Sequence, residues 1–350
     1  MSPPPATDAH SGSRRIFDPV VFGTLCGLAS SILYTAANGF LRALTDCDPV
    51  WVSAVKTLPT ALLMAPWMLH MHYRGQRAIP PLPALAVIAV GGLVGQVCGN
   101  IPFQWALGII GVALTVPLNL GGMIVFGTIL GRVFLREEVT LRSVLAMLVL
   151  LIAVFVLFLG AENAHDAVRG TAEAADNAKS QPHFLELALG VGAACLCGLA
   201  YAVLNTVNRY YVTRGHSLPA TLFTVSIVGM LSLGSISLWR IGLDGMVATT
   251  PRNLWLMLLA GVCNAAAFVT LTKSLQLTSL VFVNALNATQ ATTAALMGVF
   301  FFQEPPSPWL LTGVGLTIAG LLLMRKRSPL TKTLRRPAAD RVAAEIQEDS

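Results

Sequence analysis

The sequence predicts an all-α membrane protein with ten transmembrane helices, arranged as two inverted five-helix repeats. Of its 350 residues, 55% are hydrophobic and only 11% are charged, whereas a soluble domain carries about 25% charged residues. The apolar residues come in blocks of about 20, the length that an α-helix needs to cross a bilayer. In addition, short motifs of the first half of the chain recur in the second half.

Ten apolar segments are bounded by charged residues or by clusters of Pro and Gly. They cover residues 20–43, 50–69, 83–105, 111–133, 141–160, 184–208, 218–239, 254–272, 278–302 and 308–324. The turns between the third and fourth segments, and between the eighth and ninth, are expected to be very short. Residues 1–17 and 326–350 are predicted to be polar tails in the cytoplasm, and residues 161–183 an external, solvated linker.

The basic residues predict the orientation, because cytoplasmic loops carry an excess of Lys and Arg. With the N-terminus inside, 17 basic residues fall on the cytoplasmic side and five outside, while Lys56 lies within a span. Both termini are therefore expected in the cytoplasm, with the chain in the cell inner membrane. All six tryptophans lie at the predicted ends of spans, where indole rings prefer the headgroup level.

An internal repeat relates the two halves of the chain. The run Leu-Cys-Gly-Leu-Ala at 25–29 recurs at 196–200, an offset of 171 residues. Further matches, at an offset of 168, are Gln96 with Asn264 and Asn119 with Asn287. Because each repeat has an odd number of spans, the second must enter the membrane from the opposite side. Inverted repeats around a midplane site are the plan of secondary transporters; the alternative is a duplication kept for packing alone.

Two motifs give the chain a family resemblance. The junction Phe134-Leu135-Arg136-Glu137-Glu138-Val139-Thr140 is similar to the "FLGE-x-(L/V)-T" motif of EamA-type transporters of the drug/metabolite transporter superfamily. The stretch from Asp48 to Lys56 is similar to the family's "(S/D)P…R" opening, with Lys where the family usually has Arg. The resemblance implies EamA-like repeats at 18–160 and 184–325, ten helices, cytoplasmic termini and export of metabolites such as amino acids.

Polar side chains within spans are candidate site residues, because they are costly unless they face a packed interior or a wet cavity. Lys56 is the sole charge predicted well inside a helix, close to Pro59, which would bend that helix. A functional Lys56 would bind a substrate carboxylate or close an outer gate. The alternative is that its long stem reaches back to the headgroups. Without a mid-membrane carboxylate, ion coupling is expected to be weak, or to pass through Lys56 or the substrate.

Uncharged amides are predicted to ring the midplane. The candidates for substrate binding beside Lys56 are Gln96, Asn119, Asn264, Asn284, Asn287 and Gln290. On the third segment Gln96, Asn100 and Gln104 share one face, and Gly91, Gly95 and Gly99 form a neighbouring face expected to pack closely on another helix. These amides either line a cavity or only hold helices together; the match of Gln96 with Asn264 favours the cavity.

Two further pairs are candidate gates. Tyr34 and Asn38 share a face near the outer end of the first segment, and Tyr201 and Asn205 share one near the inner end of the sixth. Inverted symmetry would make them opposed gates. The alternative is that they are ordinary interfacial aromatic and capping residues.

The function expected is secondary transport, in the export direction, of a small polar or zwitterionic metabolite such as an amino acid. Neither a catalytic set nor metal-ligand spacing is visible in the spans, so no enzyme, metal or cofactor is expected. Basic residues flank the spans instead of forming a patch, which argues against a nucleic-acid partner. The partners expected are the substrate and the bilayer; a homodimer stays open. A non-transporting receptor or scaffold is the main alternative, and a membrane-embedded enzyme the weaker one.

Overall fold

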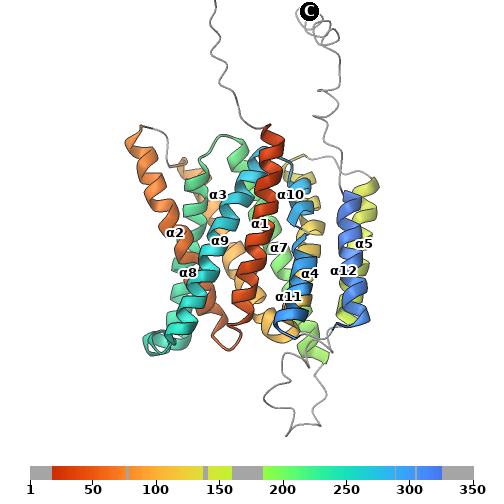
Figure 1. Ribbon diagram of the computed structural model, residues 1–350. Coiled ribbons are helices and arrows are strands. Elements are labelled where there is room, and N and C mark those ends of the chain that lie inside the picture. The colour runs from red at the N-terminus through yellow and green to blue at the C-terminus, as the bar shows by residue number, and fades with distance from the viewer. Residues whose placement is uncertain are drawn as a thin grey trace, which may run out of the picture.

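The computed structural model describes residues 18–75, 79–136, 141–159, 184–287, 289–303 and 306–324. Across these residues the regular secondary structure is helical, and the helices stand side by side in one bundle (Figure 1). The predicted tails, the linker at 161–183 and the junction residues 137–140 lie outside the described residues.

The first two helices begin where the sequence supplies a cap. Asp18 precedes α1 (Pro19–Arg42) and Asp48 precedes α2 (Pro49–Tyr73); the Asp18 carboxylate accepts one backbone N–H of the first turn and the Asp48 carboxylate accepts two. Proline at the first helical position has no N–H to leave unpaired there. With 24 and 25 residues, both helices are long enough to cross a bilayer.

The third and fourth predicted segments form one continuous helical run. It consists of α3 (Leu82–Leu93), a π-helical segment η1 (Val94–Asn100) and α4 (Ile101–Phe134), followed after a gap by α5 (Leu141–Leu159). The expected short turn is a single residue, Gly111, with φ 70° and ψ 177°. Glycine adopts this conformation without a steric penalty, so one residue redirects the helix. The π-helical segment was not predicted.

The second half has the same order of elements. They are α7 (Phe184–Thr213), α8 (Leu218–Val247), α9 (Pro251–Leu277), α10 (Leu280–Asn287), α11 (Thr289–Phe301) and α12 (Pro308–Met324). Ser217 and Thr250 cap α8 and α9 through their hydroxyl oxygens. The predicted seventh segment, 218–239, corresponds to the part of α8 that precedes a bend at Gly242, where φ is 67° and ψ 177°; after the bend the helix continues to Val247.

Six helices of the described part are long and apolar enough to cross a membrane, with α3, η1 and α4 taken as one run. Two shorter apolar helices, within α5 and α12, add to them. These lengths fit a multi-pass membrane protein. They do not confirm the count of ten crossings, because the third and fourth segments run together and the ninth is divided into α10 and α11.

Contacts between the two halves come in matched pairs. α1 packs against α9, and correspondingly α7 packs against α3 and η1; α4 packs against α7, and correspondingly α1 packs against α10 and α11. Three further pairs, α2 with α8, α4 with α11 and α5 with α12, join equivalent segments of the two halves. Two related units that meet about a two-fold axis produce this reciprocal pattern.

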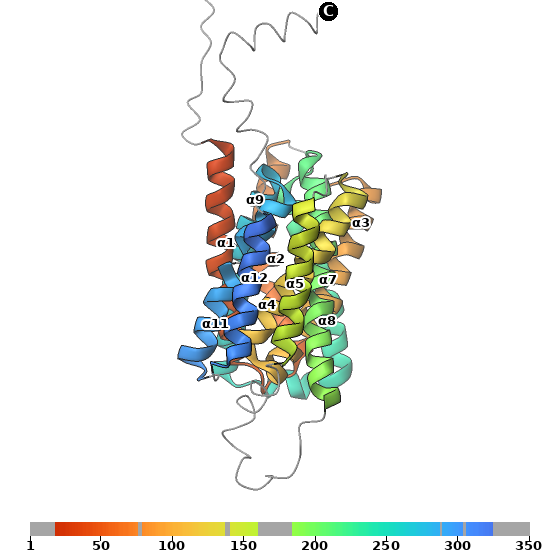
Figure 2. The ribbon, with the colours of Figure 1, turned by 90° about the vertical axis from the view of Figure 1, so that its right-hand side faces the viewer.

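The chain direction differs between the two halves. α1 begins and α12 ends at one end of the bundle, whereas α7 begins at the opposite end (Figure 1). The view turned by 90° shows the same arrangement (Figure 2). The leading helices of the two halves, α1 and α7, therefore run in opposite directions.

Glycines bring helices of different halves into close contact. A Cβ on Gly198 of α7 would lie 2.5 Å from the backbone oxygen of Asn119 and 2.7 Å from the backbone nitrogen of Met123, both on α4. Its repeat counterpart Gly27 faces α10 in the same way, with Cδ1 of Leu286 at 2.5 Å from a Cβ. Small residues permit this approach, which dispersion contacts stabilise within a bilayer.

The predicted glycine seam on the third segment is confirmed. Gly91, Gly95 and Gly99 face Val207, Leu204 and Tyr201 of α7 in turn. A Cβ on any of the three would lie 3.0 Å or less from the facing side chain. Because the seam holds the π-helical segment against α7, it fixes where the amides of that segment lie.

Candidate functional site

A cavity of about 90 Å³ lies inside the bundle between the two halves. Its wall contains ten of the predicted site residues: Tyr34, Asn38, Lys56, Gln96, Asn119, Tyr201, Asn205, Asn264, Asn287 and Gln290. They come from α1, α2, η1, α4, α7, α9, α10 and α11. The side chain of Asn284 lies outside the described residues. A cavity of this size suits a small metabolite better than the drug-sized ligands of larger pockets.

Lys56 points into this cavity and not toward the headgroups. Its residue is 3% exposed, and its Nζ donates a hydrogen bond to Oδ1 of Asn100 at 2.8 Å. The neighbouring Pro59 and the backbone oxygen of Lys56 pack against Gly261 of α9. The alternative that the lysine stem reaches back to the membrane surface is therefore wrong.

Asn100 is the centre of the hydrogen-bond network. Its Oδ1 accepts from Lys56 and, at 2.5 Å, from the hydroxyl of Tyr201, while its Nδ2 donates to Oε1 of Gln96. Gln96 in turn donates to the backbone oxygen of Val225 on α8 at 3.5 Å. The network ends on a peptide carbonyl, which is uncharged. Lys56 is therefore its one charged member, and the network contains no negative charge.

No carboxylate of the described residues compensates this charge. Those residues place their acidic side chains at helix ends or in turns, at Asp18, Asp46, Asp48, Glu186 and Asp244. An ammonium group has three N–H donors, and only the bond to Asn100 is present for Lys56 within the described part. Two donors of a buried cation therefore lack a protein acceptor.

The repeat-related amides Asn119 and Asn287 share a second feature. Both are buried, with 8% and 2% exposure, and among the residues that the structure describes the Oδ1 atom of each has no hydrogen-bond partner. An unsatisfied buried acceptor costs about 1–3 kcal/mol unless a ligand or water satisfies it. Asn119 follows Pro117, which interrupts the hydrogen bonding of α4 near the cavity.

Gln104 has a different role from the other two amides of its stripe. Its Nε2 donates to the backbone oxygen of Leu41 at 2.9 Å, which links α4 to the end of α1. Gln96 and Asn100 thus line the cavity, whereas Gln104 does not line it and holds two helices together.

The four candidate gate residues lie around the same cavity as the amides. Asn38 and Asn205 are buried, and Asn205 donates to the sulfur of Met123 at 3.4 Å. They are therefore not headgroup-level residues of the ordinary kind. Their role as gates stays a prediction.

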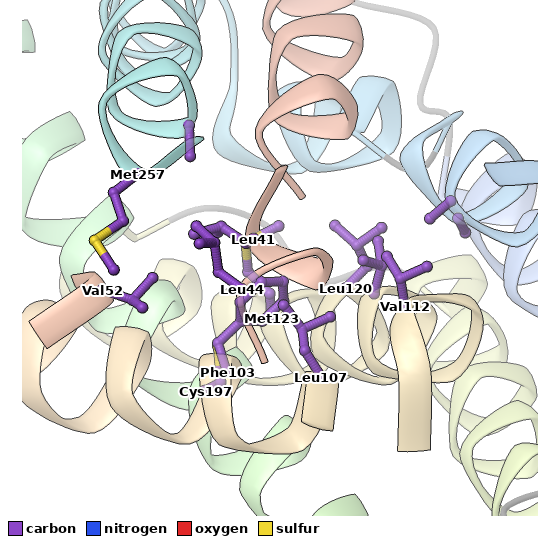
Figure 3. Close-up of a cluster of buried hydrophobic side chains, with 14 of the residues drawn as sticks. Leu41, Leu44, Val52, Phe103, Leu107, Val112, Leu120, Met123, Cys197 and Met257 are labelled. Carbon is purple, nitrogen blue, oxygen red and sulfur yellow. The ribbon is translucent and has the colours of Figure 1, made fainter. Parts of the chain in front are cut away.

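An apolar cluster contributes to the cavity wall near the end of α1. Figure 3 shows Leu41, Leu44, Phe103, Leu120 and Met123 packed together with side chains of α2, α7 and α9. Leu41, Phe103, Leu120 and Met123 also form part of the cavity wall. These four side chains form an apolar floor of the cavity.

Sequence reasoning missed the central position of Asn100 and the apolar floor. The spacing of Asn100 four residues after Gln96 was a usable signal, because residues four apart share a helix face. No periodic pattern in the sequence predicts the π-helical segment that carries Gln96 and Asn100, although such segments often occur at functional sites.

A seam of hydroxyl groups joins α1 to α11 beside the cavity. The side-chain oxygens of Ser31 and Thr289 are 2.5 Å apart, and those of Thr35 and Thr293 are 2.8 Å apart. α1 belongs to the first half of the chain and α11 to the second. Hydroxyl pairs of this kind contribute little to helix association within a membrane.

Comparisons with known proteins agree with this architecture. No curated protein sequence matches the chain. A solved structure titled only "Crystal structure of protein" has 16% sequence identity and a TM-score of 0.56, and the match covers 90% of this chain and 99% of that one. At this identity the likeness shows the fold alone.

A family model matches both halves of the chain. The model is that of the EamA-like transporter family, and it matches residues 21–159 and again residues 188–326. The two matches reproduce the internal repeat and cover most of the sequence. The chain therefore belongs to the EamA-like transporter family.

Proposed function

We propose that the protein is a secondary transporter that carries a small metabolite with an anionic group across the inner membrane. An amino acid is the representative substrate, and export is the direction. In this proposal ten spans form two inverted repeats, both termini lie in the cytoplasm, and alternating access exposes the cavity to each side in turn.

The observation that carries the proposal is the buried, unpaired charge of Lys56. A buried cation without a counter-ion is strongly destabilising, and here two of its donors have no acceptor in the described part of the chain. A carboxylate in the cavity would supply both the negative charge and the missing acceptors. Charge-assisted hydrogen bonds of this kind are about twice as strong as neutral ones.

The amides on the facing helices suit the rest of such a substrate. Asn119 and Asn287 each have a side-chain oxygen without a partner in the described part of the protein, and an amide oxygen accepts hydrogen bonds from an ammonium group. These groups carry no fixed charge, so they orient a zwitterion without holding it too tightly to be released.

Counter-flow into proteoliposomes tests the proposal. Vesicles loaded with an unlabelled solute would take up the same solute in labelled form, with L-alanine, L-leucine and L-glutamate as candidates that carry a carboxylate and uridine and glucose as solutes without one. We expect uptake of at least one amino acid and of neither uncharged solute.

At an amino-acid concentration well below saturation, Lys56→Gln should strongly reduce this uptake, because the substrate carboxylate loses its charged partner. Gly192→Ala is the matched control, because Gly192 is exposed on α7 and a Cβ added there would have no atom within 4 Å. Uptake of uridine or glucose alone, or full uptake by Lys56→Gln, would show that the lysine does not select an anionic substrate.

A further inference from the structure

We propose that this carrier is an exchanger, in which a bound anionic group is needed for the cavity to pass from one side of the membrane to the other. The inference rests on the proposed function and specifies how the same site regulates it. Its origin is the single uncompensated charge in the cavity wall.

The charge of Lys56 is isolated from every helix that packs around it. α2 contacts α4, α8, α9 and η1, and α7 also approaches Lys56. The charged side chains of the described parts of these helices lie near helix ends and are exposed or half-exposed: Arg132, Glu186, Arg209, Arg240, Asp244, Arg252 and Lys273. Arg240 is itself paired with Asp48 at the start of α2, at 3.2 Å.

The groups that do approach Lys56 are uncharged. Asn100 accepts its hydrogen bond, and the same oxygen is shared with the hydroxyl of Tyr201. Cys197 of α7 is also close enough to interact with the lysine. Because Oδ1 of Asn100 already accepts two hydrogen bonds, the network has little capacity left for the remaining donors of the ammonium group.

The consequence concerns the occluded state that every alternating-access cycle must cross. When the cavity is open to water, water molecules solvate the ammonium group. When the cavity closes empty, that water is lost and the charge stays buried without a counter-ion, which is unfavourable. A bound carboxylate pairs with the ammonium group during closure. The loaded carrier therefore switches sides faster than the empty one.

Comparing the rate of exchange with the rate of net efflux distinguishes the return of the loaded carrier from the return of the empty one. Proteoliposomes containing the labelled amino acid that gave counter-flow would be diluted into buffer with or without the same unlabelled amino acid outside. The membrane potential is clamped with potassium and valinomycin. We expect efflux at least tenfold faster with amino acid outside, a factor that corresponds to about 1.4 kcal/mol between the two barriers.

Two substitutions remove the isolated charge in different ways. Lys56→Gln deletes the cation and retains an N–H donor toward Asn100. Asn100→Asp keeps the cation and places a carboxylate oxygen where Oδ1 lies, at 2.8 Å from Nζ. Measured at saturating amino acid, both variants should bring the ratio of exchange to net efflux close to one. Gly192→Ala should retain the wild-type ratio.

Each outcome has a defined meaning. No counter-flow of any amino acid contradicts the proposed function itself. Counter-flow together with equal exchange and net efflux in the wild type leaves a transporter but overturns the exchanger. Net efflux that rises to the exchange rate when a pH gradient is imposed also overturns it, because the lysine would then lose its proton on the return step. If Lys56→Gln fails to fold, Asn100→Asp alone decides the role of the charge.

Discussion

Replacing Gly198 by alanine tests whether backbone contact between the two halves supports the cavity. The new Cβ would lie 2.5 Å from the backbone oxygen of Asn119 and 2.7 Å from the backbone nitrogen of Met123. Both atoms belong to a helical backbone and cannot rotate away, so α7 must move off α4. Over-packing of this kind costs about 1–3 kcal/mol. Since Asn119 and Met123 also line the cavity, transport should fall as well.

Gly192→Ala on the same helix separates this packing cost from helix propensity. Alanine stabilises a helix over glycine by about 0.5–1 kcal/mol, and this gain is common to both variants. Gly192 has nothing within 4 Å of the added Cβ. The difference in unfolding free energy between the two variants, measured by SDS titration in mixed micelles, should therefore be about 1–3 kcal/mol.

The repeat counterpart supplies a graded comparison. Gly27→Ala meets Cδ1 of Leu286 at 2.5 Å, which is the end of a flexible side chain and can move aside. It should therefore destabilise the protein less than Gly198→Ala. Stabilities of Gly198→Ala and Gly192→Ala within about 0.5 kcal/mol of each other, the range of neutral surface changes, would refute the reasoning.

Three further substitutions test other parts of the structure. Gly111→Ala forces an alanine into φ 70°, which should cost about 1–3 kcal/mol in the same SDS titration; an unchanged midpoint would argue against the turn at this residue. Gln104→Leu removes the hydrogen bond to the backbone of Leu41 and should cost about 0.6 kcal/mol without changing KM for transport; a raised KM would place Gln104 in the site. In a background without the natural cysteines, Thr35→Cys with Thr293→Cys replaces two oxygens 2.8 Å apart. Oxidation should stop transport and reduction restore it, and a cross-linked protein that still transports would exclude movement at this seam.

Several features of the fold were predictable because they depend on local sequence. Apolar blocks of the length of a bilayer mark the helices, and Asp18 and Asp48 cap the first two of them. The glycine seam at 91–99 was also predictable, since residues four apart on a helix share a face. These signals lie within single helices, so no knowledge of neighbouring helices is needed to read them.

The junctions between helices were harder to predict. Gly111 reorients the chain with a single positive φ, and η1 changes the helical hydrogen-bonding pattern over seven residues. Both conformations depend on the helices packed around them. The sequence predicted a short turn between the third and fourth segments but not that a single residue forms it, and the pattern of residue types did not reveal the π-helical segment.

The site, too, was predictable from the sequence only in part. Repeat symmetry pointed to Gln96, Asn119, Asn264 and Asn287, and these residues line one cavity; their part in substrate binding stays a prediction. Symmetry did not indicate that Asn100 would join Lys56, Tyr201 and Gln96. A hydrogen-bond partner depends on the rotation and depth of each helix, and these are set by packing.

The sequence by itself therefore determined the apolar spans, the duplication and the identity of the polar groups inside the bundle. These follow from composition and periodicity, which the bilayer constrains directly. Only the tertiary structure decided that Lys56 is buried and turned inward, that Asn100 holds it, and that Gln104 packs elsewhere. The direction of a long side chain is fixed by contacts between helices that are far apart in the sequence. The rotation of a helix about its axis decides whether a given side chain faces the cavity or packs against a neighbouring helix.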